Sequence, residues 1–141
     1  MPKGNKGYYR EPSIYKNKIV FVSEDDLWCI NFNIESHASR LTSNVGRVAS
    51  PKFSLDGKYI AYAGTEEGNM EVYIIHSEGG ISKRVTYTGS TALRIVCWDK
   101  NKIIFASNHN SPVGNYSLFS VDINGGIPKD LKLGISSDLS Y

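Results

Sequence analysis

Apolar and polar residues alternate over short stretches of this chain, and the clearest stretch spans Ser50 to Gly64. Alternation with a period of two is typical of β-strands that bury one face. An Asp-Gly pair between two such runs favours a β-hairpin, because Gly readily adopts a positive φ. We therefore predict two strands, Val48 to Leu55 and Lys58 to Gly64, joined by a type I′ turn at Asp56-Gly57.

The second strand of this hairpin has a counterpart on either side. The three copies begin at Lys18, Lys58 and Lys102, and each continues as a run of aliphatic, β-branched and aromatic residues. The lysines are 40 and 44 residues apart, which lies within the range of about 40 to 50 residues for four-stranded propeller blades. The pattern therefore indicates a repeat protein.

Two further residue patterns, which we use as landmarks, recur with a similar period. An aliphatic residue followed by an aromatic one recurs at Leu27-Trp28, Val72-Tyr73 and Leu118-Phe119. A third set follows at Arg40-Leu41-Thr42, Arg84-Val85-Thr86 and Asp130-Leu131-Lys132. Together with the strand before each lysine, these landmarks predict four strands in every repeat. No helical period is sustained, which excludes solenoids of helix pairs.

The predicted fold class is all-β, with about three four-stranded antiparallel blades of an incomplete β-propeller. The period assigns residues 8–46 to the first blade, 47–89 to the second and 90–133 to the third, and residues 134–141 to the start of a fourth. Propellers close with about four to eight blades, so three blades leave two broad apolar faces uncovered. We expect either a longer chain with further blades or closure by pairing with another copy.

Composition removes several classes of function. The chain has 141 residues, 21% of them charged, and a net charge of +2, with no cluster of basic and aromatic residues that would bind nucleic acid. No apolar run approaches the roughly 18 residues of a membrane span, and no apolar segment follows the basic start. We therefore expect a cytoplasmic protein that contacts neither nucleic acid nor membrane.

Catalytic and metal-binding motifs are not found in the sequence. No Gly-x-Ser-x-Gly segment occurs, and the three histidines do not have the spacing of metal ligands. Cys29 and Cys97 lie in repeats one and three, so a disulfide between them is not expected. We predict no catalytic residue, no metal and no cofactor in this chain.

One segment near the start of the chain resembles the sequence of a known protein family. The segment from Val22 to Trp28, with Asp-Asp-Leu-Trp at its end, resembles the amino-terminal blades of the tricorn protease family. The segments Phe53 to Ala61 and Arg84 to Tyr87 fit the same register, although the Phe53 segment also resembles periplasmic TolB-like propellers. The resemblance covers essentially the whole chain.

This resemblance implies a six-bladed propeller, of which the chain would form the first half. In the family this propeller is followed by a seven-bladed propeller, a PDZ-like domain and the catalytic domains of a large cytoplasmic serine peptidase. Such enzymes trim peptides released by the proteasome. Their catalytic serine, histidine and acidic residues lie far downstream, so no residue here is expected to take a catalytic role.

Four charged residues are candidates for contact with peptides. Asp25 and Asp26 are predicted to lie in the loop between the second and third strands of the first blade, on a mildly acidic rim. Arg47 and Arg94 stand near the starts of inner strands, where they could project into a central channel and attract peptide carboxylates. The alternative for all four is an ordinary solvated charge.

Three hypotheses for function remain. The first is a non-catalytic scaffold and peptide entry gate of a tricorn-like peptidase, whose partners are peptides, the remaining domains of the parent chain or another copy in a homo-oligomer. The second is a stand-alone interaction module that closes by homo-dimerisation. The third is a TolB-like binding propeller, which would carry a secretion signal.

Overall fold

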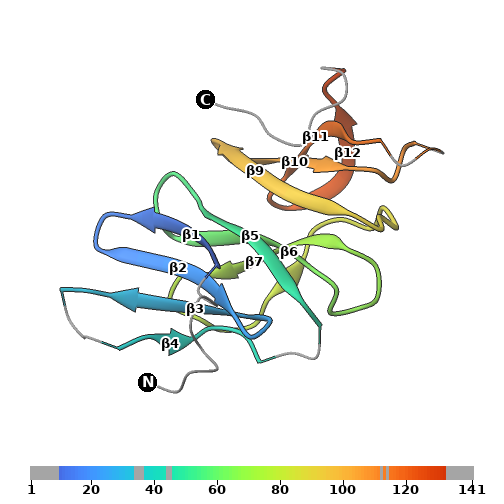
Figure 1. Ribbon diagram of the computed structural model, residues 1–141. Helices are drawn as coiled ribbons and strands as arrows, with labels where there is room; N and C mark the ends of the chain where they lie inside the picture. Colours follow the sequence, from blue (N-terminus) through green and yellow to red (C-terminus); the bar gives the residue numbers. More distant parts are fainter. Residues whose placement is uncertain (1–9, 34–36, 44–45, 112, 114, 133–141) are drawn as a thin grey trace.

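The computed structural model describes residues 10–33, 37–43, 46–111, 113 and 115–132, and their regular structure consists of β-strands only. The strands form three antiparallel sheets of four strands each, which confirms the predicted propeller blades. Figure 1 shows the sheets following one another along the chain. The expected fourth blade, residues 134–141, lies outside the described residues.

Each blade is built from four consecutive strands. Blade 1 contains β1 (Arg10–Tyr15), β2 (Lys18–Ser23), β3 (Asp26–Asn31) and β4 (Ser39–Arg40). Blade 2 contains β5 (Val48–Phe53), β6 (Tyr59–Gly64), β7 (Glu71–His76) and β8 (Lys83–Arg84). Blade 3 contains β9 (Leu93–Asp99), β10 (Lys102–Ser107), β11 (Ser117–Asp122) and β12 (Gly125–Asp130). No strand of one blade pairs with a strand of another among the described residues.

The first strand of every blade lies at the inner edge of its sheet. β1 contacts β5, and β5 contacts β9, so the three inner strands run side by side about a common axis. No helix in the described part of the chain is long and apolar enough to cross a membrane.

The register of strand pairing in the structure corrects two details of the repeat that the sequence predicted. Tyr59 pairs with His76 as Lys18 pairs with Asn31, so Tyr59, and not Lys58, is the structural counterpart of Lys18. In blade 3 the glycine-rich turn expected at residues 124–126 is shorter, because Gly125 and Gly126 belong to β12. Both errors arise because loop lengths differ between blades, so similar residue types in the sequence do not always mark equivalent positions in the sheets.

The turn at Asp56-Gly57 is not the predicted type I′ turn, because only Gly57 has a positive φ, of 74°. The hairpin closes instead through a longer loop, in which Gly57 N–H donates to Ser54 O at 2.9 Å and Ser54 N–H donates to Tyr59 O at 2.8 Å. The Asp56 carboxylate accepts Lys58 N–H at 3.0 Å and stabilises this loop.

A tight turn with positive φ at both central residues occurs elsewhere. Glu24 and Asp25 have φ values of 52° and 66° between the paired residues Ser23 and Asp26. This geometry is that of a type I′ hairpin turn. It explains why β3 begins at Asp26, one residue earlier than the sequence predicted.

Stacked aromatic rings fill the interfaces between blades. Tyr62 and Tyr73 stack with ring centroids 5.6 Å apart, and Phe105 and Phe119 do the same at 5.7 Å. Each pair is buried against small aliphatic side chains of the preceding blade: Val20, Val22 and Leu27 for the first, Ala61, Ala63 and Val72 for the second. Burial of one large apolar side chain stabilises a fold by about 1.5–3 kcal/mol, so these faces hold neighbouring blades together.

No strand in the described part of the chain covers the corresponding face of blade 1. Phe21 and Trp28 pair across β2 and β3 at the position of the stacked rings, and Trp28 is half-buried. On the same side, Ile14 is 66% exposed. This apolar face has the character of the faces that are buried in blades 2 and 3.

Side chains also connect the inner strands. The Glu11 carboxylate of β1 accepts Ser50 N–H of β5. In turn Ser50 Oγ accepts Ile95 N–H of β9 at 2.9 Å, and Trp98 Nε1–H of β9 donates to Lys52 O at 3.0 Å. Ser50 lies at a bulge in β5 with a positive φ of 48°, which frees its N–H from the sheet ladder. The inner strands are therefore fixed to one another without forming a common sheet.

Replacement of Gly57 by valine should destabilise the β5–β6 hairpin and the contact between blades 1 and 2. Gly57 has a φ of +74°, and a Cβ there would stand 2.2 Å from Tyr15 Cε2. Backbone strain and overpacking together should lower the free energy of unfolding by about 3 kcal/mol. Thermal unfolding followed by circular dichroism measures this change.

Gly89→Val provides the matched control. Gly89 has the same φ of +74°, but the nearest atom that a Cβ there would meet is Asn69 Nδ2, at 3.9 Å. We expect a smaller loss, of about 1–2 kcal/mol, from strain alone. Equal losses in the two variants would show that the close approach of Gly57 to Tyr15 does not matter.

Candidate functional site at the link face

One end of the propeller carries the β2–β3 and β6–β7 loops together with the links between blades, and we call it the link face. Asp25 lies there, exposed, in the type I′ turn. Arg47 is exposed immediately before β5, and its backbone is held by Thr65, whose Oγ1 accepts Arg47 N–H at 2.9 Å. Arg94 is exposed on the inner strand β9, where it pairs with Ala106.

Asp26 does not lie in an exposed loop, and that prediction is wrong. It begins β3 and is only 4% exposed. Thr42 Oγ1–H donates to Asp26 Oδ1 at 2.6 Å, and Arg40 Nε donates to Oδ2 at 3.0 Å. Because the preceding turn ends at Asp25, the next side chain points into the blade, where the outer strand supplies both donors.

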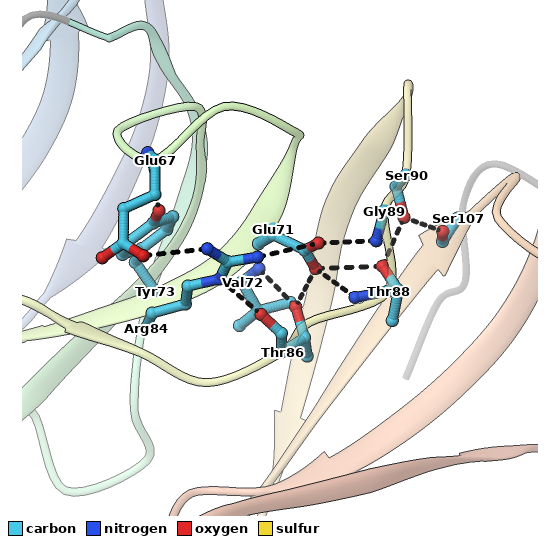
Figure 2. Close-up of polar contacts among 10 residues, drawn as sticks. All are labelled: Glu67, Glu71, Val72, Tyr73, Arg84, Thr86, Thr88, Gly89, Ser90 and Ser107. Atoms are coloured by element: carbon cyan, nitrogen blue, oxygen red, sulfur yellow. Dashed lines mark hydrogen bonds and ion pairs between the residues drawn. The ribbon is translucent and has the colours of Figure 1, made fainter.

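Glu71 occupies the equivalent place in blade 2 and is fully buried. Thr86 Oγ1–H donates to Glu71 Oε1 at 2.6 Å, and Thr86 Oγ1 accepts Val72 N–H at 2.9 Å. Arg84 approaches Glu71 Oε2 at 3.4 Å and also pairs with Glu67 at 2.9 Å. Figure 2 shows these groups converging on the carboxylate. The cluster fixes the outer strand β8 to β7 at the link face.

The same carboxylate also holds the link to blade 3. Thr88 N–H and Thr88 Oγ1–H each donate to Glu71 Oε1 at 2.9 Å, and Gly89 N–H donates to Oε2 at 2.7 Å. Burial acts to raise the pKa of Glu71, but the hydrogen bonds led by Thr86 outweigh it and hold the pKa below its ordinary value. Glu71 is therefore ionised at neutral pH and binds its donors as an acceptor only.

A chain of hydroxyl groups continues from Thr88 into blade 3. Thr88 Oγ1 and Ser90 Oγ are 2.7 Å apart, and Ser90 Oγ and Ser107 Oγ are 2.6 Å apart. Ser107 Oγ lies 2.7 Å from His109 Nδ1. Figure 2 shows the chain as far as Ser107.

The donor and acceptor in each hydrogen bond of this chain follow from Glu71, because its ionised carboxylate can only accept. Because Thr88 donates its hydroxyl proton to the carboxylate, Ser90 must donate to Thr88 and Ser107 to Ser90. His109 Nδ1 then donates to Ser107. Burial lowers the pKa of His109, which favours the neutral imidazole. The hydrogen bond to Ser107, whose own proton is donated to Ser90, places the proton of this neutral ring on Nδ1.

This order of protons does not suit nucleophilic catalysis. A serine nucleophile must give its proton to the histidine, whereas here the histidine donates to the serine. Ser107 is also completely buried. No group of three or more His, Cys, Asp and Glu side chains with metal-binding geometry occurs among the described residues. The network therefore acts as a structural connection between blades 2 and 3.

Cys29 and Cys97 are free and half-buried, in β3 and β9. Burial raises the pKa of each thiol, so neither is an activated nucleophile. No hydrogen bond or ion pair joins the four predicted peptide-contact residues to one another in the described structure. Asp25 and Asp26 belong to blade 1, Arg47 immediately precedes the inner strand of blade 2, and Arg94 lies in the inner strand of blade 3.

Comparison with known families decides the relationship. The model of the tricorn protease N-terminal β-propeller domain matches residues 6–141. The chain belongs to this tricorn family. Among solved structures, the crystal structure of the tricorn protease superposes with a TM-score of 0.83 at 25% identity, covering 100% of this chain and 14% of that one.

Relatives identified by sequence similarity are also described as tricorn-type proteins. A tricorn-like protease N-terminal subunit of Sulfurisphaera tokodaii is 30% identical over 96% of this tricorn-family chain and 71% of its own length. A tricorn protease homologue of Saccharolobus solfataricus is also 30% identical, over 95% of this chain but only 13% of its own length. A TolB protein of Agrobacterium tumefaciens, at 19% identity and a TM-score of 0.70, shares the fold. The chain thus spans a small part of the long tricorn relatives.

The threonine that connects the third and fourth strands should be essential in blade 2 of this tricorn-type propeller. Thr86→Val removes the donor to Glu71 and the acceptor of Val72 N–H, and leaves both partners buried. We expect the free energy of unfolding to fall by about 3 kcal/mol. Urea unfolding followed by fluorescence measures the change.

Lys132 is the matched control, because it stands at the same repeat position in blade 3 and is exposed. Lys132→Asn should change stability by less than about 0.5 kcal/mol, because Asn tolerates the positive φ of 58° at this position. A comparable loss in both variants would contradict a specific role for the Glu71 cluster.

The Glu71 cluster should also make stability depend on pH. The folded-state pKa of Glu71 lies below its ordinary value of 4.5, so its contribution is present above pH 4.5 and is lost as the pH falls through the folded-state pKa. We expect Glu71→Gln to be less stable than the wild type at pH 7, and the difference to shrink in acid. Urea midpoints at both pH values test this, and a gap that widens in acid would argue against it.

Proposed function

We propose that this chain is the amino-terminal part of the propeller of a tricorn-like serine peptidase that degrades peptides downstream of the proteasome. In that enzyme it serves as a non-catalytic scaffold and as part of the peptide entry gate. The observation that carries the proposal is the family match over residues 6–141.

Arg94 is the residue most suited to a gate. It is exposed on the inner strand β9, next to Ile95, whose N–H is held by Ser50 of the neighbouring inner strand. A fixed backbone under an exposed guanidinium provides a positive charge of defined position near the axis. Arg47, exposed before the inner strand β5, would add a second charge at the link face. Peptide carboxylates are the ligands that such charges attract.

The remaining partners follow from the parent family. The rest of the parent chain would supply the further blades and the catalytic domains, since this chain covers 13% of the Saccharolobus solfataricus relative. We propose a cytoplasmic location and assembly into a homo-oligomer.

A stand-alone module that closes with a second copy is the other candidate. It is favoured by two observations: no described strand is shared between blades, and Ile14 and Phe32 of blade 1 are 66% and 54% exposed. Analytical ultracentrifugation of the 15.7 kDa chain separates the hypotheses. A discrete dimer favours the module, and a monomer or disordered aggregate favours the gate.

The gate should be tested in the complete parent enzyme. We expect Arg94→Glu to lower kcat/KM for long peptides about fivefold by repelling their carboxylates, with the effect reduced at high salt. Hydrolysis of a short fluorogenic substrate should change less. Lys58→Glu, at an exposed lysine in the β5–β6 loop, is the control for net charge. Equal losses in the two variants would refute a local role for Arg94.

A further inference from the structure

Two adjoining hollows lie between blades 2 and 3, at the end of the propeller opposite the link face. Each has a volume of about 240 Å³, and both are lined by Tyr59 and Ile123. One extends to Ile81 and Lys83, and the other extends to Leu55 and Lys100. Because Tyr59 and Ile123 line both of them, the two hollows adjoin, and we call them together the blade 2–3 groove.

The equivalent place between blades 1 and 2 is closed by an ion pair. Lys18 Nζ lies 2.6 Å from Glu78 Oε2, across a smaller hollow of about 160 Å³. In the register of the sheets, Tyr59 replaces Lys18 and Asn124 replaces Glu78. No hydrogen bond or ion pair joins Tyr59 to Asn124 in the described structure. The blade 2–3 groove therefore lacks the bridge of its neighbour.

Several apolar side chains in the walls of the blade 2–3 groove are unusually exposed. Ile81 is 96% exposed and Leu55 is 66% exposed, whereas Trp98 and Ile75 beneath them are buried. Removing such side chains from water is favourable, so a ligand that covers Ile81 and Leu55 gains binding free energy.

The charged groups at the blade 2–3 groove favour an acidic ligand. Lys83 and Lys100, one in each hollow, are exposed and form no ion pair with a described residue. Asp56 also lines the groove, but its carboxylate already accepts hydrogen bonds from Ser54 Oγ–H at 2.8 Å and from Lys58 N–H at 3.0 Å. A ligand with negative charge at both ends and apolar groups between them matches this arrangement.

We propose that the blade 2–3 groove binds an extended peptide segment whose apolar side chains are flanked by acidic residues. The apolar side chains cover Tyr59 and Ile123 between Ile81 and Leu55, and the carboxylates pair with Lys83 and Lys100. Two lysines are fewer than the many phosphate contacts that dominate nucleic-acid binding, so a nucleic acid is not the expected ligand. Arg94 does not line the groove, so binding there does not depend on the proposed passage of peptides near Arg94.

The test uses the full chain and the capped peptide acetyl-Glu-Leu-Leu-Glu-amide, titrated while amide chemical shifts are recorded by NMR. We expect shifts at Tyr59, Ile81 and Ile123, and weaker binding in high salt. Ile81→Ser should weaken binding about tenfold. The double variant Lys83→Glu with Lys100→Glu should weaken it about fivefold. All three side chains are exposed, so the variants should fold.

Ile127 provides the matched control. It stands at the same repeat position in blade 3 as Ile81 in blade 2 and is 95% exposed, but it does not line the groove. Ile127→Ser should bind like the wild type. A peptide with lysine in place of glutamate, acetyl-Lys-Leu-Leu-Lys-amide, should bind at least about fivefold more weakly.

Three results would overturn the proposal. The first is no shift at millimolar peptide concentration. The second is equal weakening by Ile81→Ser and Ile127→Ser, or equal binding of the two peptides. The third is a dimer of the chain that Ile81→Ser disrupts, since the groove would then be a contact between copies. None of these results depends on hydrolysis by a parent enzyme, so the proposed function is tested separately.

Discussion

The packing of stacked aromatic rings on small aliphatic side chains holds this protein together. Tyr62 and Tyr73 of blade 2 lie against blade 1, and Phe105 and Phe119 of blade 3 lie against blade 2. Each pair bridges the second and third strands of its own blade, so it stabilises the sheet and the interface at the same time. The inner strands and the link face are positioned by these contacts.

Polar contacts define the angle at which blades 2 and 3 meet. An ionised, fully buried carboxylate requires several donors, and Glu71 obtains them from the outer strand and from the link to the next blade. The chain of hydroxyl groups then connects the Glu71 carboxylate to Ser107 of blade 3. The blade 1 equivalent, Asp26, has the donors from its outer strand in Arg40 and Thr42. Blade 3 has Ser117 and Lys132 at these positions and lacks the cluster.

The sequence was sufficient for the period, the four strands of each blade and the family. These features depend on the alternation of apolar residues, which is a local property. The repeated Arg-x-Thr at residues 40–42 and 84–86 was visible as a landmark. The role of this pattern in binding a buried acid could not be predicted. The acid, Asp26 or Glu71, precedes the pattern by more than a dozen residues and comes close to it only through strand pairing.

The candidate site was predicted less well, for the same reason. Asp25 and Asp26 are adjacent in sequence, yet one is exposed and the other is buried, since a type I′ turn ends between them. The blade 2–3 groove also could not be predicted. It depends on the replacement of Lys18 by Tyr59, which the sequence comparison had aligned one residue away.

Because every described sheet is built from consecutive strands, a boundary between blades is a seam without ladder hydrogen bonds. Opening such a seam breaks side-chain packing and a few hydrogen bonds to the backbone of the neighbouring blade, and it leaves each sheet intact. A ring of blades of this kind can widen at one seam while its blades move as rigid bodies. It can also gain or lose a blade during evolution by insertion or deletion of one contiguous segment of the gene.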